Sequence, residues 1–244
     1  MLDPALYPLT WRVVRRRLYG SPIALASVLV FPVLVAWIGF GDSYGTAAKF
    51  FFFLLPHVFL VAAQDAVRTD IESGALESVL FLGGRFRGYL RAKLFVLAAA
   101  AGIYAAVLFG LFAAWGLAAG GFESRFVVQF GLAVLAGLYY IAIAVTLSHG
   151  LKAGSNVLVV LLAQSAVLIG LIVSVTPRTG LLDYAATGRF PGLGPKLVFA
   201  GLTAVLPNVV VAGKDPVFAA EVLAGIGLAV FVRERLIRGL ELKK

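Results

Sequence analysis

The sequence predicts an all-helical integral membrane protein: a six-transmembrane-helix bundle with an N-terminal amphipathic interfacial helix and a re-entrant or interfacial outer segment before the last span. Composition, long uncharged runs and the placement of basic residues point to this fold class. Of the 244 residues, 61% are hydrophobic and 14% are charged, with a mean hydropathy of +0.98. Soluble domains are about 45–50% apolar and about a quarter charged. Residues 1–244 are therefore expected to form a single transmembrane domain.

Residues 1–20 are predicted to form a cytoplasmic helix that lies on the membrane surface. Four apolar residues follow a 4-3-4 spacing that places them on one helix face: Tyr7, Trp11, Val14 and Leu18. Arg12 and Arg16 lie away from that face, as expected for an interfacial helix. Gly20 and Pro22 separate this helix from the first span.

Six runs of the chain are predicted to cross the membrane, which requires about 20 residues for a hydrocarbon core of ~30 Å. They are Ser21–Gly41, Phe50–Gln64, Leu94–Phe122, Phe126–Leu151, Ala153–Pro177 and Pro216–Val232. Phe50–Gln64 is short, and is counted because Lys49 can extend its ammonium group to the headgroups. Tyr44 and the run Phe50–Phe53 are expected in an outer aromatic belt.

The basic residues predict the orientation of these spans. With six spans and the N-terminus inside, 15 of the 21 Lys and Arg residues fall on the cytoplasmic side, in accord with the positive-inside rule. Both termini are then cytoplasmic. A seventh span at Leu197–Gly213 would place the basic tail Arg233–Lys244 outside, so this part of the outer loop, 178–215, is predicted to re-enter or to lie at the interface. The same topology accounts for the net charge of +9 without a nucleic-acid partner.

Residues 65–93, between the second and third apolar runs, carry a concentrated polar surface, with nine charged residues among 29. The pattern Thr69-x-x-Glu72 is typical of a capping box and predicts a helix from Ile71 to about Leu82, ended by Gly83-Gly84. The basic residues that follow are spaced to sit at lipid headgroups: Arg85, Arg87, Arg91 and Lys93. A polar loop in an apolar chain indicates contact with a soluble partner, and an ordinary loop helix lying on the bilayer remains the alternative.

This loop resembles a segment of type-2 ABC transporter permeases, the transmembrane subunits of ABC transporters. Glu72-Ser-Gly-Ala-Leu-Glu-Ser-Val-Leu80, then Arg85 and Tyr89-Leu-Arg-Ala-Lys93, is similar to the family pattern E-x-G-T-L-E-x-L-L … R-x-x-x-L-x-x-K. The family also has an N-terminal amphipathic helix, six spans and a broken outer segment before the last span. Two positions depart from the pattern: Ala75 replaces Thr, and Gly83-Gly84 stands where the family often has proline.

The resemblance implies a permease that is not itself an enzyme and holds no cofactor, since ATP and Mg²⁺ bind to a separate cytoplasmic ABC ATPase subunit with a P-loop. The length leaves no room for such a module in this chain. The implied ATPase-docking residues are Asp70, Ile71, Glu72, Gly74, Leu76, Glu77, Val79 and Leu80. The other implied partners are the lipid bilayer and a second permease, in a homodimer or a paired assembly. The implied direction is efflux.

The host is predicted to be prokaryotic, with the chain in the inner or plasma membrane, because Arg outnumbers Lys by 14 to 7. Inside the spans, His57 and Glu221 are the candidates for lining a transport path, since intramembrane ionisable groups are functional candidates. A neutral His57 bonded to a backbone carbonyl is the structural alternative. Asp65 and Arg68 are expected to pair. Three amides are expected to bond between helices: Gln129, Asn156 and Gln164.

Two other functions remain open on the sequence. An ion-coupled secondary transporter usually needs carboxylates near the midplane, and no Asp or Glu falls there. A non-transporting membrane scaffold could recruit a soluble partner through the same loop. Membrane enzymes are disfavoured because the sequence shows no acid–base or metal cluster and has no cysteine.

Overall fold

The computed structural model describes residues 6–20, 22–64, 66–74, 77, 86–151, 155–172, 192–197, 207 and 215–241. These residues form helices and no strands, so the expected all-helical class is confirmed. The predicted re-entrant segment Leu197–Gly213 lies outside the described residues except for Leu197 and Pro207, as does most of the outer loop.

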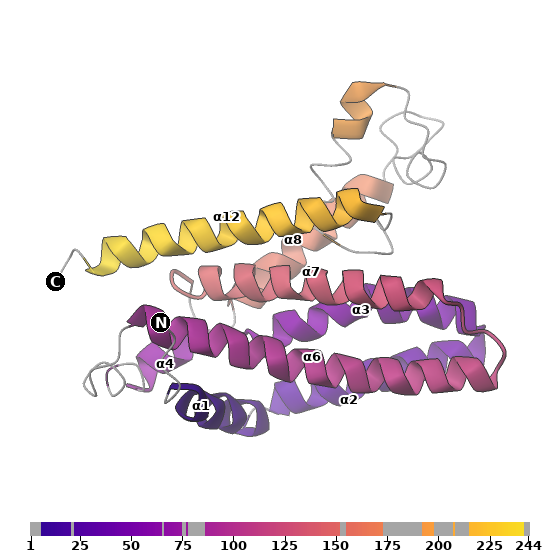
Figure 1. Ribbon diagram of the computed structural model, residues 1–244, viewed down its shortest axis with the longest axis horizontal. Helices are drawn as coiled ribbons and strands as arrows, with labels where there is room; N and C mark the ends of the chain where they lie inside the picture. Colours follow the sequence, from indigo (N-terminus) through magenta and orange to yellow (C-terminus); the bar gives the residue numbers. More distant parts are fainter. Residues whose placement is uncertain are drawn as a thin grey trace.

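The longer helices run alongside one another as a bundle, and α8 (Ser155–Ile172) lies obliquely behind them (Figure 1). They are α1 (Leu6–Gly20), α2 (Pro22–Gly41), α3 (Tyr44–Ala62), α4 (Arg68–Glu72), α6 (Phe86–Ala118), α7 (Arg125–Leu147), α8 (Ser155–Ile172) and α12 (Asp215–Glu241). Helix α7 is central, since α3, α6, α8 and α12 all contact it. Three helices of the described chain are long and apolar enough to span a membrane: α3, α6 and α7. This composition is that of a helical membrane protein.

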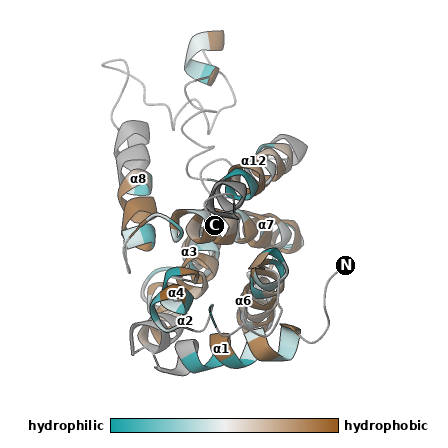
Figure 2. Cartoon of the chain, turned by 90° about the vertical axis from the view of Figure 1, so that its left-hand side faces the viewer, coloured by the Kyte–Doolittle hydropathy of each residue, from teal (hydrophilic) through white to brown (hydrophobic). Residues whose placement is uncertain are grey.

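Helix α1 lies across one end of the bundle, at a steep angle to the spans (Figure 2). Val14 is buried, and Tyr7 packs edge-on against Phe95 of α6 with ring centroids 5.5 Å apart. Trp11 is 47% exposed, and the inward position next to it is taken by Thr10, whose hydroxyl donates to the Leu6 carbonyl at 2.6 Å. The face that packs on the bundle is therefore rotated slightly from the predicted one. The helix ends at Gly20, as expected.

Two spans begin earlier than the sequence predicted. Helix α3 starts at Tyr44 because the Ser43 side chain accepts a hydrogen bond from the Thr46 amide, an N-cap that the sequence reasoning missed. Helix α6 starts at Phe86 and runs for 33 residues, about 50 Å, which exceeds the ~30 Å hydrocarbon core. The charged residues near its start are part of the helix, because Arg and Lys are good helix formers.

The outer aromatic belt was a wrong prediction for three of its residues. Phe51 and Phe52 are buried, and Tyr44 stacks on Phe112 of α6 at 4.7 Å between ring centroids. Phe51, two turns further along α3, also stacks on the Phe112 ring, with 4.6 Å between ring centroids. Gly116 makes this approach possible, since a Cβ there would lie 2.2 Å from the Tyr44 hydroxyl oxygen. These aromatics hold α3 against α6 instead of facing headgroups.

Candidate functional site

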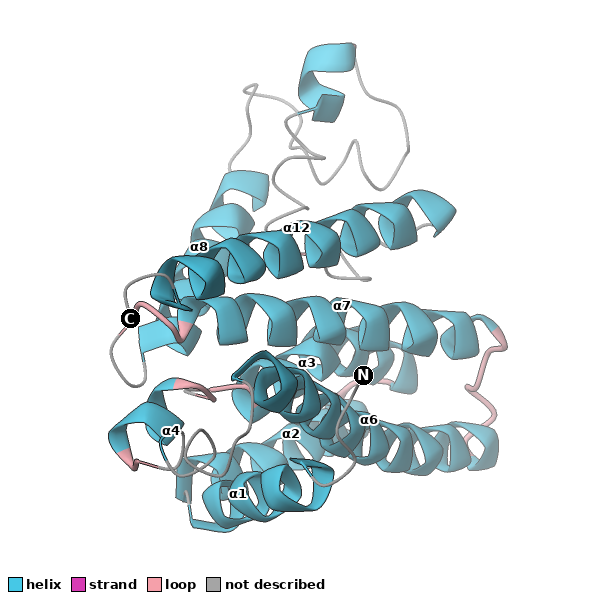
Figure 3. Cartoon of the chain, turned by 60° about the vertical axis from the view of Figure 1, so that its left-hand side comes forward, coloured by secondary structure: helices cyan, strands magenta, loops and turns pink. Residues whose placement is uncertain are grey.

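Helix α4 opens the polar loop and lies at the same end of the bundle as the start of α6 (Figure 3). It begins at Arg68 after an N-cap residue, Val67, that has no side-chain cap, so the predicted capping box at Thr69 is wrong. It stops because Gly74 takes a left-handed conformation with φ of +69°, which favours glycine and closes helices. The predicted continuous helix from Ile71 is therefore interrupted at its start. Residues 75–76 and 78–85 lie outside the described residues.

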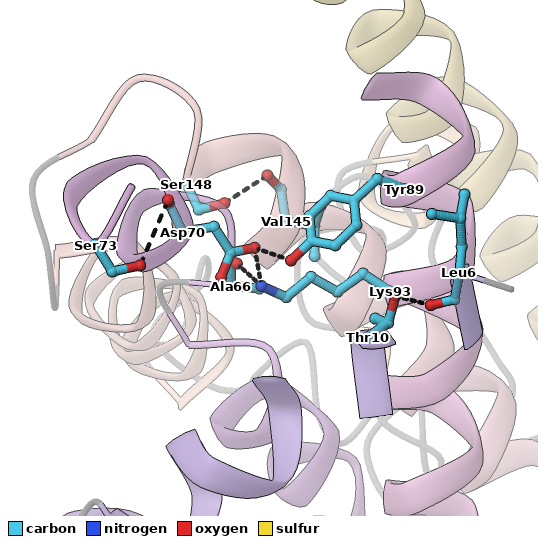
Figure 4. Close-up of polar contacts among 9 residues, drawn as sticks. All are labelled: Leu6, Thr10, Ala66, Asp70, Ser73, Tyr89, Lys93, Val145 and Ser148. Carbon is cyan, nitrogen blue, oxygen red and sulfur yellow. Dashed lines mark hydrogen bonds and ion pairs between the residues drawn. The ribbon is translucent and has the colours of Figure 1, made fainter. Parts of the chain in front are cut away.

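Asp70 joins this loop to α6 through a buried network (Figure 4). Its Oδ2 accepts a hydrogen bond from the Tyr89 hydroxyl at 2.7 Å and forms an ion pair with the Lys93 ammonium group. The same ammonium group donates to the Ala66 carbonyl, just before α4. Asp70 is 2% exposed and Lys93 1% exposed. We call these four residues, Ala66, Asp70, Tyr89 and Lys93, the Asp70 network.

The sequence predicted that Lys93 lies at the lipid headgroups. This prediction is wrong, because Lys93 is buried against Asp70. Tyr89 and Lys93 are four residues apart, so they share one face of α6 and both reach Asp70. Removal of one member of a buried ion pair typically costs about 3–5 kcal/mol, although a pair as a whole adds little compared with apolar residues. We interpret the Asp70 network as a device that fixes where α4 lies on α6.

The opposite side of α4 faces outward. Ile71 is 43% exposed and the Glu72 side chain is also exposed, as is Glu77 beyond the end of α4. Arg68 donates from Nε to Glu72 Oε1 at 2.7 Å. Arg68 thus has Glu72 as its partner, while the expected pair with Asp65 involves a residue outside the description.

The predicted docking residues consequently separate into groups. Ile71, Glu72 and Glu77 lie on the accessible surface, with Gly74 partly exposed between them. Asp70 is buried, so a partner would not touch its side chain, and its role in docking would be to position the exposed residues. The remaining three, Leu76, Val79 and Leu80, lie outside the described residues.

His57 forms a polar contact between helices α3 and α8. Its Nδ1 lies 3.2 Å from the Phe53 carbonyl oxygen, and its Nε2 lies 2.9 Å from Gln164 Oε1 of α8. The backbone-bonded reading of His57 agrees with this geometry. Asn156 of α8 donates to the Ala144 carbonyl of α7 at 3.1 Å, so it and Gln164 bond between helices as predicted.

Some polar atoms beside His57 have no hydrogen-bond partner among the described residues. They are the Tyr140 hydroxyl and Gln164 Nε2, both buried. The Tyr140 ring lies edge-on to His57, with centroids 5.5 Å apart. Glu221, the other predicted path residue, is partly buried on α12. No hydrogen bond or ion pair joins it to His57 in the described part of the chain.

A charged cluster at the α4 end was not found by sequence reasoning. Arg87 and Arg91 of α6 and Arg233 of α12 surround one carboxylate, Glu234. His149, in the turn after α7, lies edge-on to Phe86, the residue before Arg87, with ring centroids 6.2 Å apart. The residues come from three distant parts of the chain, and no local pattern in the sequence joins them.

No protein-family model, curated protein or solved structure matches this chain. Within the described ranges, no group of three or more His, Cys, Asp or Glu side chains is placed to hold a metal ion. The arrangement of the Asp70 network suits mechanical connection, since its one carboxylate is buried and its Oδ2 is bonded to both Tyr89 and Lys93.

Proposed function

We propose that this chain is the transmembrane permease subunit of an ABC transporter, driven by a separate cytoplasmic ATPase that docks on residues 70–80. The observation that carries the proposal is the Asp70 network, which attaches an exposed polar segment to the first turns of a long span. The resemblance of Glu72–Leu80 to the permease loop supports it. The 244 residues contain no G-x-x-x-x-G-K-[ST] pattern, and the resemblance implies that the ATPase is a separate subunit.

The Asp70 network could transmit a movement of α4 to α6. A partner that moves the exposed face of α4 also moves Asp70, and the ion pair to Lys93 carries the displacement to α6. Ala66 moves with them because its carbonyl accepts from the same ammonium group. Ala66 follows α3 closely, so α3 and α6 would shift together. These two helices also meet at the far end through Tyr44 and Phe112.

The proposal includes six spans, cytoplasmic termini, pairing with a second permease, and export from a prokaryotic inner membrane. A reporter that works only in the cytoplasm should be active when fused after Lys244 or within Arg85–Lys93, and inactive near Gly120 or Gly192. Activity at Gly192 would contradict the six-span topology.

Glu221 and His57 are proposed to line the path. The chain has no cysteine, so Glu221→Cys and His57→Cys can each be probed with a small polar thiol reagent. Reaction from the outer side supports a wet path at that position, and protection assigns the residue a packing role.

The direct test uses the tagged full-length chain purified from its native host. With the native sequence, a polypeptide with a P-loop should co-purify and hydrolyse Mg-ATP in a substrate-dependent way. Ile71→Asp and Leu76→Asp should abolish both, because docked helices are held by a few apolar anchors. Glu77→Gln should change little, since rim charges contribute little.

The matched control is Leu193→Asp, an equally drastic change at a 71% exposed leucine outside this loop. If Leu76→Asp and Leu193→Asp leave ATPase recovery and stimulation equally intact, the loop is not the coupling element. Transport that continues with an ATPase-dead partner and follows an ion gradient would support the secondary-transporter alternative. Recovery of a partner without an ATPase would support the scaffold.

A further inference from the structure

The charged cluster at the α4 end is loosely bonded. Glu234 Oε2 lies 3.8 Å from Arg87 Nε, and its Oε1 lies 3.8 Å from an Arg91 nitrogen and 3.5 Å from an Arg233 nitrogen. A charge-assisted hydrogen bond to a carboxylate is typically about 2.7–2.9 Å long. Among the described residues, Arg91 and Arg233 have no other acidic partner. Arg91 and Arg233 thus share the Glu234 carboxylate at distances longer than an ordinary charge-assisted hydrogen bond.

Arg233 has a buried hydrogen-bond donor without an acceptor. The residue is 5% exposed, and its Nε has no hydrogen-bond partner among the described residues. A buried charged group normally has its donors satisfied, because each unmet donor costs free energy. A guanidinium group with an unpaired donor beside a second guanidinium fits a multivalent oxygen acceptor better than it fits one distant carboxylate.

His149 adds a second unpartnered nitrogen at the same junction. Its Nδ1 lies 2.8 Å from the Val145 carbonyl oxygen, which leaves Nε2 as the other ring nitrogen. Nε2 is buried and has no partner in the described part of the chain. Burial lowers the pKa of His149, and the positive charge of Arg233 lowers it further. The ring also lies edge-on to Phe86 of α6, with centroids 6.2 Å apart, and the Thr146 hydroxyl near the end of α7 donates to the Ala229 carbonyl of α12 at 3.4 Å.

We propose that this junction binds the phosphate group of an anionic membrane lipid, held by Arg91 and Arg233. Phosphate offers several acceptor oxygens in the geometry that guanidinium groups match. The source is a lipid because apolar surface continues from the cluster along α12, where Leu228, Phe231 and Val232 are exposed. Hydrophilic residues mark the near ends of α6 and α12 in Figure 2. Basic pockets between transmembrane helices on the cytoplasmic side suit anionic headgroups.

The site is independent of the transport proposal, since it requires only a helical bundle in a membrane. It would fix the end of α12 to the start of α6, at the same end as the Asp70 network. Glu234 then acts as the internal competitor of the lipid, holding the arginines in place when no phosphate is bound.

The test is a titration of the purified full-length chain with phosphatidylglycerol or phosphatidylcholine, with bound lipid counted by native mass spectrometry. Phosphatidylglycerol should bind saturably, and more tightly than phosphatidylcholine. Arg91→Gln should weaken phosphatidylglycerol binding roughly fivefold, the effect of one basic residue near a membrane surface. Arg233→Gln should weaken it more. Glu234→Gln should tighten binding roughly fivefold, because a nearby negative charge is removed.

The matched control is Arg125→Gln, which removes an exposed arginine paired with Glu123 at the opposite end of α7 and should leave binding unchanged. The proposal is overturned if Arg91→Gln and Arg125→Gln bind alike, or if Glu234→Gln weakens binding as Arg233→Gln does. Equal affinity for phosphatidylcholine would also overturn it. Displacement of phosphatidylglycerol by millimolar inorganic phosphate would assign the site to a soluble phosphate and reject the lipid. If Arg233→Gln does not fold, Arg91→Gln and Glu234→Gln carry the test, since both side chains are partly exposed.

Discussion

The two ends of the bundle are stabilised by different chemistry. At the end that carries α4, charged groups join the helices: the buried pair of Asp70 with Lys93, and the arginines around the partly exposed Glu234. At the opposite end, aromatic side chains hold the helices together. The Tyr44 ring stacks on Phe112 with 4.7 Å between centroids and lies edge-on to Trp115 with 5.2 Å between centroids. Aromatic packing is close and depends little on conditions, whereas charged networks respond to partners, pH and ligands. The α4 end is therefore joined mainly by charged contacts, and the opposite end by aromatic packing.

The largest effect is expected from breaking the Asp70 network on one side. Lys93→Met leaves the Asp70 carboxylate buried without its cation, and should lower the free energy of unfolding by about 3–5 kcal/mol. The double variant Asp70→Leu/Lys93→Met should recover most of this loss, because no buried charge remains. Thermal or denaturant unfolding in detergent measures both.

Lys49→Met is the control for this experiment, since Lys49 is an exposed lysine near the aromatic end. It should change stability little. The Asp70 network would not stabilise the fold if Lys93→Met and Lys49→Met lowered the free energy of unfolding equally. The same conclusion would follow if the double variant were as unstable as Lys93→Met.

Overpacking the contact between α3 and α7 should have the next largest effect. A Cβ at Gly137 of α7 would lie 2.4 Å from the buried Phe59 ring of α3. Gly137→Val should therefore cost about 1–3 kcal/mol, seen as a lower unfolding temperature. Gly131→Val on the same helix is the matched control, since a Cβ at Gly131 meets nothing within 4 Å. Similar unfolding temperatures for the two variants would show that the α3–α7 contact tolerates expansion.

The smallest effect is expected from His149 at the α4 end. Burial and the charge of Arg233 lower the pKa of His149 below its ordinary value. The unfolded chain then binds the proton more readily than the folded one, so stability should fall as the pH drops below about 6.5 towards the folded pKa. His149→Gln should flatten this part of the profile, measured by unfolding temperature between pH 5 and 7. An unchanged slope would mean that other groups set the pH dependence.

The sequence predicted the apolar helices of the bundle better than the charged contacts at the α4 end. Long uncharged runs indicated α2, α6, α7 and α8, because an apolar run of about 20 residues is typical of a membrane helix. Helix starts were missed where a polar residue was taken as a boundary, as at Lys49 in α3. A lysine can lie on the exposed face of a helix without ending it, and the true signal was the cap at Ser43.

The candidate site was predicted in place but not in structure. The charged loop was recognised from its composition, yet Asp70 was assigned to the surface and Lys93 to the headgroups. Their pairing joins residues 23 positions apart, and only the packing of α4 against α6 brings them together. The cluster of Arg91, Arg233 and Glu234 has the same origin, since its helices meet only in the folded chain.

The most direct test of the coupling role places a crosslinker on the exposed face of the loop. The native chain has no cysteine, so Ile71→Cys, Glu77→Cys and Leu193→Cys each give one attachment site for a short photoactivated reagent in native membranes. Positions 71 and 77 should crosslink to one polypeptide with a P-loop, and position 193 should not. If the ATPase co-purifies but crosslinks only from position 193, or from none of the three, the motor binds elsewhere and the central claim is contradicted.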